Sequence, residues 1–224
     1  MIEQDEVLGI AHVPDGEEMR LVRHSDGFSI LLRDTDLMST VASASEEALA
    51  TMTCARLGER ADLQLLIGGY GMGYTLRAAL DTLDDDAGIV VSEIAPEIIE
   101  WARGPMQSVT GNCLDDPRVT LVEDDVAVLI DAARGAYDGI LLDVDNGPEG
   151  LTRRLNDYLY SKTGLGAAMT ALRPGGILSV WSAEPEPRFT TRLEEVGFSV
   201  SEETVRARPN GKGFRHHIWF AQKR

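Results

Sequence analysis

Residues 63–73 read LQLLIGGYGMG, and this stretch decides the fold of the chain. Its first part, Leu63–Ile67, is a mainly apolar run of the kind found in buried parallel strands. A glycine cluster follows, and a helix is predicted from Met72 to Thr82. Glycines let the backbone turn tightly and approach a ligand, while the start of the helix offers free N–H groups. The stretch therefore predicts a strand, a glycine loop and a helix, which either bind a ligand or form a plain turn.

The chain after this stretch alternates between strand-like and helix-like segments. The predicted strands are 88–91, 119–122, 137–142 and 177–181, the predicted helices are 95–103, 126–133, 164–172 and 188–196, and a closing strand pair is predicted at 198–205 and 214–220. Strands that alternate with helices form βαβ units, which build a parallel sheet covered by helices on both faces. The predicted fold class is therefore α/β, with a doubly wound, mainly parallel sheet.

The first forty residues have a different pattern. Short strand-like runs at 7–13, 19–23 and 28–33 are separated by Asp15-Gly16 and Asp26-Gly27, which are typical hairpin turns. A helix is predicted to begin at Ser45, with Ser45 as its N-cap and two acidic residues in its first turn. We therefore expect a small antiparallel β-hairpin region at residues 1–44 and a Rossmann-like domain at residues 45–224.

Composition limits the partners and the compartment. The net charge is -16, from 37 acidic and 21 basic residues, which opposes binding to nucleic acid. Two cysteines can form neither a disulfide framework nor a zinc cluster, which favours the cytoplasm. The N-terminus lacks the pattern of a secretory signal, and no apolar run approaches the roughly 18–20 residues of a membrane span. We expect a cytoplasmic protein, without nucleic acid or membrane partners, with a homodimer as its candidate assembly.

The spacing of the glycines selects the class of ligand. Gly69, Gly71 and Gly73 give G-x-G-x-G, whereas a dinucleotide fingerprint is G-x-G-x-x-G and here has Tyr74 at its last position. No Gly-Lys-Ser/Thr follows, so the loop is not a phosphate-binding Walker loop. The loop, with Gly68 before it, resembles the cofactor loop of class I S-adenosylmethionine (SAM) enzymes.

Acidic residues follow the next two strands. Glu93 comes about 20 residues after the glycine loop, where a carboxylate can accept hydrogen bonds from ribose hydroxyls. Asp125, next to Val126, follows the third strand, where an acid can accept from an adenine amino group. The alternative for Glu93 is an exposed acid that caps the next helix, and the alternative for Asp125 is a plain N-cap. Together with the glycine loop they predict a nucleoside pocket at the carboxyl edge of the sheet.

The fourth predicted strand and the residues that follow it read YDGILLDVDNGP at 137–148. This segment resembles the catalytic segment of the spermidine synthase (polyamine aminopropyltransferase) family. The similarity runs from about residue 34 to 181, and includes DDPRV at 115–119 and PGG at 174–176. These enzymes transfer an aminopropyl group from decarboxylated SAM to an amine and leave methylthioadenosine. Their core has the class I methyltransferase fold.

The resemblance implies a role for each matching residue. Asp143 is expected to orient the attacking amine and accept its proton, and Asp145 to hold a cation close by. Glu93 would bind the ribose and Asp125 the adenine, with decarboxylated SAM or SAM as co-substrate and no metal. The alternative for the two aspartates is a turn after a strand, where aspartate is common. Trp181, Tyr158 and Tyr160 are expected at the substrate pocket, with core packing as their alternative.

Three departures from the family pattern keep other functions open. Family members usually carry Gly-Gly-Gly-Asp-Gly-Gly, whose Asp holds the amine of the aminopropyl chain, and Gly71 stands at that position here. The family's Tyr-His-Glu patch is replaced around 39–43, and the chain is shorter at its C-terminal end than a typical member. The acceptor would be a small amine or another small nucleophile. Aminopropyl transfer is therefore the first hypothesis, methyl transfer from SAM the second, and a non-catalytic nucleoside-binding protein the third.

Overall fold

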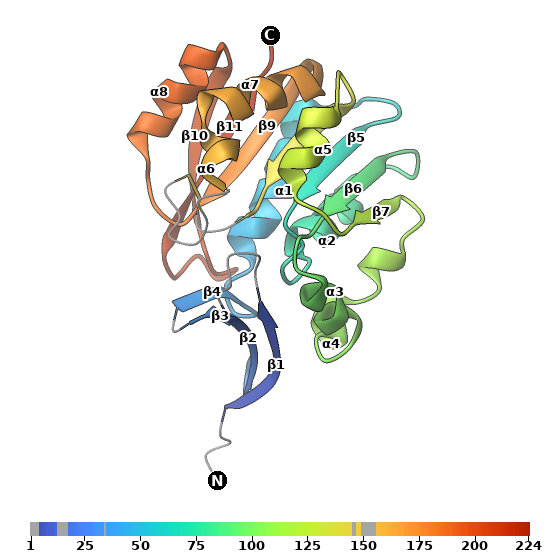
Figure 1. Cartoon of the computed structure of the whole chain (residues 1–224), viewed down its shortest axis with the longest axis vertical. Helices are drawn as coiled ribbons and strands as arrows, with labels where there is room; N and C mark the ends of the chain where they lie inside the picture. The colour runs from blue at the N-terminus through green and yellow to red at the C-terminus, as the bar shows by residue number, and fades with distance from the viewer. Residues whose placement is uncertain (1–4, 13–17, 34, 145–146, 149–155) are drawn as a thin grey trace.

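The computed structural model describes residues 5–12, 18–33, 35–144, 147–148 and 156–224, and it contains two sheets (Figure 1). The strands of the larger sheet are β5 Gln64–Gly68, β6 Gly88–Ser92, β7 Val119–Val122, β8 Tyr137–Leu142, β9 Leu172–Ser182, β10 Ser199–Arg206 and β11 Arg215–Gln222. Their order in space is β10-β11-β9-β8-β5-β6-β7. β5 to β9 pair in parallel, and β11 runs antiparallel to both β9 and β10.

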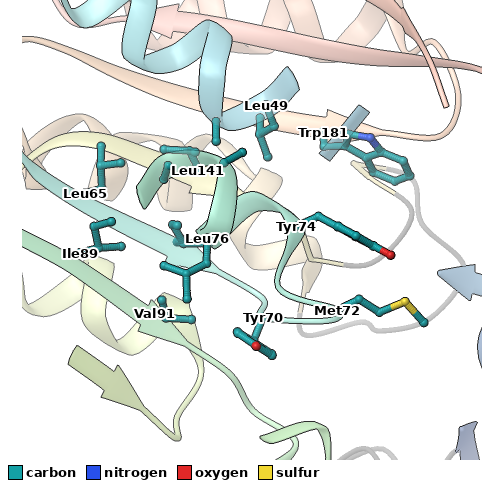
Figure 2. Close-up of a cluster of buried hydrophobic side chains, with 14 of the residues drawn as sticks. Leu49, Leu65, Tyr70, Met72, Tyr74, Leu76, Ile89, Val91, Leu141 and Trp181 are labelled. Atoms are coloured by element: carbon teal, nitrogen blue, oxygen red, sulfur yellow. The ribbon is translucent and has the colours of Figure 1, made fainter. Parts of the chain in front are cut away.

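Helices cover both faces of this sheet, which confirms the predicted doubly wound α/β fold. Their bounds are α1 Ala44–Leu57, α2 Tyr74–Thr82, α3 Pro96–Arg103, α4 Gln107–Thr110, α5 Val126–Ala132, α6 Asn156–Tyr160, α7 Lys162–Ala171 and α8 Pro187–Val196, with a 3-10 turn at Cys113–Asp115. Successive side chains of a strand point to opposite faces. Accordingly Leu65 and Ile67 of β5 pack with α1, α2 and α3, while Leu66 packs with α5, α7 and α8. Figure 2 shows the first of these cores, from Leu65 in the sheet to Trp181.

The N-terminal region forms a separate four-stranded antiparallel sheet. Its strands are β1 Glu6–His12, β2 Glu18–His24, β3 Gly27–Leu32 and β4 Thr35–Ser39, paired in that order. The predicted turn at Asp26-Gly27 lies between β2 and β3, whereas Asp15-Gly16 lies outside the described residues. The inner face of this sheet packs against the first core of the larger sheet, through residues such as Leu21 and Ile30. The division at residues 1–44 and 45–224 stays a prediction.

Some local predictions were wrong. The helix α1 begins at Ala44 with Ser43 at its N-cap position, so Ser45 is not the cap. Instead, Ser45 lies inside the first turn, fully buried, and its hydroxyl bonds to side chains. The short elements β4, α4, α6 and the 3-10 turn were not predicted, because elements of three to five residues carry too little periodicity.

None of the helices in the described part of the chain is long and apolar enough to cross a membrane.

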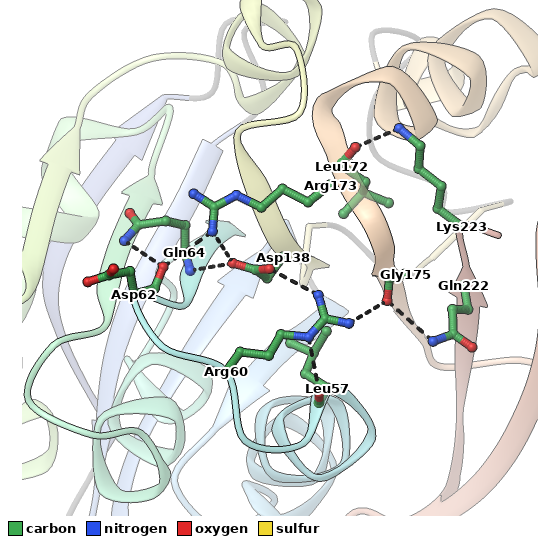
Figure 3. Close-up of polar contacts among 10 residues, drawn as sticks. All are labelled: Leu57, Arg60, Asp62, Gln64, Asp138, Leu172, Arg173, Gly175, Gln222 and Lys223. Carbon is green, nitrogen blue, oxygen red and sulfur yellow. Dashed lines mark hydrogen bonds and ion pairs between the residues drawn. The ribbon is translucent and has the colours of Figure 1, made fainter.

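An ion-pair network fixes the amino ends of the central strands (Figure 3). Asp138 is buried near the start of β8 and accepts from Arg60 Nη1 at 3.0 Å and from Arg173 Nη1 at 2.6 Å. Its other contact is the backbone N–H of Gln64, the first residue of β5, at 2.9 Å. A buried carboxylate needs such partners because desolvation of an unpaired charge is costly. Polar contacts thus close this edge, while the carboxyl edge carries the predicted ligand site.

Candidate functional site

A pocket of about 160 Å³ opens at the carboxyl ends of β5, β6, β7 and β8. Its floor and walls come from the segments that follow these strands, and its roof comes from the N-terminal sheet. The lining residues are Gly69, Gly71, Ser92, Glu93, Ile94, Ala95, Ile98, Asp124, Asp125, Val126, Asp143, Val144, Glu46, Trp181 and, in the roof, Met19, Ile30, Leu32, Leu37 and Met38. Doubly wound sheets bind ligands at this edge. The pocket combines a largely apolar lining with a few carboxyl groups, as small-molecule sites do.

The glycine loop forms one wall of the pocket. Gly69 has φ +86°, and a Cβ on it would lie 2.4 Å from the backbone oxygen of Asp143. No other residue fits there, so this glycine lets the loop approach the chain that leaves β8. Gly68 is the last residue of β5 and Gly73 the N-cap of α2, and neither lies on the pocket wall. Two of the four predicted glycines therefore face the pocket and two shape its base.

Glu93 is buried between the glycine loop and the start of α3. Its Oε2 accepts from the N–H of Tyr70 at 2.9 Å, and its Oε1 accepts from the N–H of Ala95 at 2.9 Å. Burial raises the pKa of this carboxyl, and the backbone N–H groups act in the opposite direction. The alternative of an exposed helix-capping acid is wrong in its exposure, because only 8% of the residue is exposed. Glu93 both holds the loop in place and lines the pocket.

Asp125 caps α5 and also lines the pocket. Its Oδ1 accepts from the N–H of Ala127 at 2.9 Å as the N-cap of α5, and the residue lines the pocket. Val126 beside it is buried on the same wall. Helix capping and a place at the pocket are therefore compatible, and contact with adenine stays a prediction.

Asp143 lies directly after β8 and faces the pocket. Its Oδ2 accepts from the hydroxyl of Thr75 at 2.8 Å. Burial raises the pKa of Asp143 to about 6, and the hydrogen bond from Thr75 works against that rise. The carboxyl group is then mainly ionised at neutral pH and can accept a proton. Asp145, its predicted companion, lies outside the described residues.

Glu46 is a further carboxyl group in the pocket, and the sequence did not single it out. It looked like an ordinary acid in the first turn of a helix, but only 5% of it is exposed. Burial, and then the charge of Asp143, raise the pKa of Glu46 to about 8. At neutral pH Glu46 is mainly protonated, so Asp143 and Glu46 together carry about one negative charge. Only tertiary packing brings Asp143 and Glu46 together, and no local sequence pattern predicts this pair.

We expect Glu46→Gln to flatten the dependence of stability on pH. Because the pKa of Glu46 is raised from 4.5 to about 8, the folded protein holds a proton that the unfolded chain has lost. The wild type therefore loses stability as pH rises from about 4.5 to about 8, and the glutamine variant lacks this loss. The melting temperature of the variant minus that of the wild type should therefore be several degrees larger at pH 8 than at pH 5. Each kcal/mol of stability corresponds to about 2–4 °C in melting temperature.

Thermal melts of both proteins between pH 5 and pH 9 check this prediction. Glu47→Gln, at the next position of α1 and outside this pocket, controls for loss of a helix carboxylate. Parallel melting curves for wild type and Glu46→Gln would contradict it.

The aromatic residues predicted at the substrate pocket divide into two groups. Trp181 at the end of β9 lines the pocket, as the sequence predicted. Tyr160 is instead 1% exposed and its hydroxyl donates to the backbone oxygen of Val144 at 3.2 Å. Tyr158 donates to Asp131 Oδ1 at 2.7 Å, and neither tyrosine is on the pocket wall. The structure thus places both tyrosines outside the described pocket lining, packed toward the helical layer, and their role as substrate-binding residues stays a prediction.

Met38 occupies the space beside Gly71. The loop glycine has φ +54°, and a Cβ on it would lie 2.5 Å from Met38 Sδ. The backbone N–H of Met72 points at the same sulfur, at 3.1 Å. The position where the family carries an acid is thus covered here by a thioether.

A second, larger cavity of about 640 Å³ adjoins the pocket, and we call it the groove. It shares Leu37, Met38, Glu46 and Trp181 with the pocket. Its other charged or titratable lining residues are Asp36, Glu184, Glu186, Arg208, Arg215 and His216. His216 and His217 lie on opposite sides of β11, since His216 bonds to Ser45 and His217 to Glu202.

Known proteins resemble this chain in sequence and in fold. Residues 44–192 match the family model described as the spermine/spermidine synthase domain. Polyamine aminopropyltransferase 2 of Pseudomonas aeruginosa is 27% identical over 161 residues, which are 69% of this chain and 43% of the relative. Putrescine N-methyltransferase 4 of Nicotiana tabacum is 34% identical over 125 residues, which are 52% of this chain and 30% of the relative. The chain thus spans less than half the length of these two relatives.

A solved spermidine synthase, in complex with the transition-state analogue AdoDATO, shares the fold with a TM-score of 0.75. The two chains are 20% identical, and the match covers 97% of this chain and 72% of the other. Because the family model spans most of the described sheet and both of its helical layers, the chain belongs to the spermine/spermidine synthase family.

Proposed function

We propose that this chain transfers an aminopropyl group from decarboxylated SAM to a small amine. One observation carries the proposal: the Asp143 carboxyl group faces the same pocket as the glycine loop and Glu93. The names of the relatives support it, since the Pseudomonas protein is a polyamine aminopropyltransferase and the solved synthase binds a transition-state analogue. Because the chain spans only part of its curated relatives, the activity is inferred from its own pocket as well.

The proposed reaction needs an electrophile, a nucleophile and a base. The sulfonium of the donor is the electrophile, and it needs no metal to activate it. The amine nitrogen attacks the carbon next to sulfur, the C–S bond breaks, and its electrons leave with methylthioadenosine. An amine that arrives protonated must first lose a proton, and Asp143 is the base that takes it. The negative charge of Asp143 also attracts the cationic amine.

The acidic residues of the pocket are the proposed hydrogen-bond acceptors for the adenosyl part of the donor. The Glu93 carboxyl group accepts the backbone N–H groups of Tyr70 and Ala95 and also faces the pocket, where it is the proposed acceptor for a ribose hydroxyl. Asp125 is the proposed acceptor for the adenine amino group. Ile94 and Val126 are the apolar neighbours of these acids on the pocket wall. Such a site orients the donor sulfur relative to Asp143.

The groove is the proposed entry for the amine. Three exposed or half-exposed acids, Asp36, Glu184 and Glu186, line it together with two arginines. Glu46 and Trp181 belong to both cavities, so an amine in the groove reaches the pocket beside Asp143. Small amines are cations in water, and carboxylates at the mouth raise their local concentration.

Methyl transfer from SAM to an amine is the second candidate, and the contact between Met38 and Gly71 favours it. An acid at position 71 would bind the free amine of the aminopropyl chain and repel the carboxylate of SAM. Here the thioether of Met38 stands in that space, so neither effect operates. The tobacco relative is a putrescine N-methyltransferase, which gives this candidate a precedent in the family.

A competition assay separates the two candidates. The chain is incubated with equal amounts of SAM and decarboxylated SAM and one diamine such as putrescine, and the products are identified by mass spectrometry. Methylthioadenosine and an amine extended by one aminopropyl group are expected. A methylated amine without methylthioadenosine would overturn the ranking, and no product with several diamines would favour a non-catalytic protein.

Restoring the acid of the loop should shift the choice of donor, but only if Met38 is removed as well. Gly71→Asp alone places a Cβ 2.5 Å from Met38 Sδ, at a φ of +54° that aspartate tolerates better than most residues. The double variant Met38→Ala/Gly71→Asp is therefore expected to favour decarboxylated SAM by roughly 10–150-fold in kcat/KM, as one charge-assisted hydrogen bond allows.

Met38→Ala/Gly71→Asn is the matched control, because it has the same shape without the charge. The ratio of kcat/KM values for the two donors is measured in both double variants and in Met38→Ala. An equal ratio in the aspartate and asparagine variants would show that position 71 does not contact the aminopropyl chain.

A further inference from the structure

A chain of two hydrogen bonds joins the pocket to the groove. Ser45 Oγ lies 2.5 Å from Glu46 Oε2 and 2.8 Å from His216 Nδ1. Glu46 lines both cavities, whereas His216 lines only the groove. Ser45 is fully buried between them and connects α1 to β11 across 171 positions of sequence. Buried side chains are here aligned between the Asp143 pocket and a surface that solvent reaches.

The hydroxyl of Ser45 couples the protons at its two ends. A serine has one O–H to donate, so it donates toward one neighbour and accepts from the other. When Glu46 is ionised, Ser45 donates to it and accepts from Nδ1–H of His216. When Glu46 carries its proton on Oε2, that O–H donates to Ser45, and Ser45 donates to an unprotonated Nδ1. The presence of a proton on Oε2 of Glu46 therefore determines which nitrogen of the His216 ring is protonated.

The groups packed around the path affect the pKa values of its two ends, Glu46 and His216. Glu46 faces Asp143 from β8 and Glu47 from its own helix, and burial with these charges raises its pKa. His216 neighbours His217 on β11 and Glu184 after β9, and its ring contacts Trp181 with centroids 4.7 Å apart. Burial lowers the pKa of His216, so the ring is neutral above pH 7. Asp36, Glu186, Arg208 and Arg215 complete the titratable and charged groups described in the groove.

Asp143 and Glu46 are linked at the inner end of the path. Both line the pocket, and the hydroxyl of Thr75 contacts each of them. It lies 2.8 Å from Asp143 Oδ2 and 3.3 Å from the backbone oxygen of Glu46. Thr75 thus contacts both the carboxyl group of Asp143 and the backbone of Glu46, and the charge of Asp143 acts on the Glu46 carboxyl group and raises its pKa.

We propose that Glu46, Ser45 and His216 form a path that carries the proton from Asp143 out to the groove. The proposal rests on the proposed function for the source of this proton, which is the amine of the acceptor. Asp143 passes the proton to one oxygen of Glu46 while the other gives its proton to Ser45. Ser45 gives its own to His216 Nδ1, and Nε2–H of the ring releases one to the groove. Asp143 ends ionised and can accept the next proton, while Glu46, Ser45 and His216 each end with as many protons as they began with. The path is ready again when the proton of Glu46 returns to Oε2 and the His216 ring returns to the Nε2–H tautomer, so these three are positioning residues that reset the base.

Nitrogen NMR of the histidine side chains tests the path without any substrate. Between pH 7 and pH 9 the His216 ring should change from the Nε2–H to the Nδ1–H tautomer as Glu46 loses its proton. In Ser45→Ala the change should disappear, and Glu46→Gln should fix one tautomer at every pH. His217→Gln is the matched control, since His217 bonds to Glu202 at 2.8 Å on the other side of β11. That variant should retain the change at His216.

Kinetics then tests whether the path serves turnover. Ser45→Ala and His216→Gln should lower kcat by roughly 10-fold, less than loss of the base itself, with KM nearly unchanged. Their kcat should rise with buffer concentration, while that of wild type and His217→Gln should not. One tautomer of His216 throughout pH 7–9 in the folded wild type would overturn the path, even in an active enzyme. The tautomer change without turnover on either donor would instead contradict the proposed function and leave the hydrogen-bonded path intact.

Discussion

Asp143→Asn is expected to lower turnover by about 10²–10⁴-fold while donor binding largely survives, which is the usual scale for a positioned general base. The substitution keeps the shape of the side chain and removes both the proton acceptor and the negative charge. The amide of the variant can still contact the hydroxyl of Thr75, which in the wild type lies 2.8 Å from Asp143 Oδ2. The loss should therefore appear in kcat rather than in the affinity for the adenosyl group.

The pH profile gives this prediction a second readout. Asp143 works as a base only when ionised, and burial raises its pKa to about 6. Turnover by the wild type should therefore rise with pH through about 6, and the residual turnover of Asp143→Asn should lack that rise. Thr75→Val, which removes the hydroxyl contacts to Asp143 and to the backbone oxygen of Glu46 but keeps the base, is the control and should lose much less activity. Full turnover by Asp143→Asn would leave this aspartate a structural role.

Glu93→Ala should weaken the binding of methylthioadenosine by roughly 10–150-fold, because hydrogen bonds to a charged group contribute about 1.5–3 kcal/mol. The structure adds a second effect. Glu93 accepts the backbone N–H groups of Tyr70 and Ala95, so its removal leaves two N–H groups of the loop and of α3 without an acceptor. The melting temperature should therefore fall together with the affinity.

Glu93→Gln separates these two effects. Glutamine keeps the size of the side chain and one carbonyl oxygen, so it should destabilise the fold less than alanine does. Calorimetry with methylthioadenosine and thermal melts are measured for both variants. A folded Glu93→Ala variant that binds as tightly as wild type would refute a ribose-binding role.

The parts of the fold that follow local rules could be predicted from the sequence. The mainly apolar β5, the glycine loop and the alternation that follows depend on periodicity and turn chemistry within a few residues. Glu93 and Asp125 could be placed together because parallel strands end at one edge of a sheet. That both face one pocket follows from the fold class alone.

The remaining parts depend on contacts between distant segments. Glu46 becomes a pocket residue only because α1 packs beside β8, and Met38 covers Gly71 only because an unpredicted strand forms the roof. Tyr158 and Tyr160 were placed at the site because they follow Asp143 in sequence, although α6 turns them away. The role of Asp145 stays a prediction.

Isothermal titration calorimetry with methylthioadenosine, SAM, decarboxylated SAM and NAD tests the central claim, that this pocket binds an adenosyl-sulfur ligand. We expect saturable binding of one methylthioadenosine per chain, binding of at least one sulfonium donor, and weaker binding of both in Glu93→Ala, by roughly 10–150-fold. NAD should not bind, because the loop lacks the third glycine of the dinucleotide fingerprint. Binding of NAD together with no heat from any adenosyl-sulfur compound would contradict the assignment of the pocket.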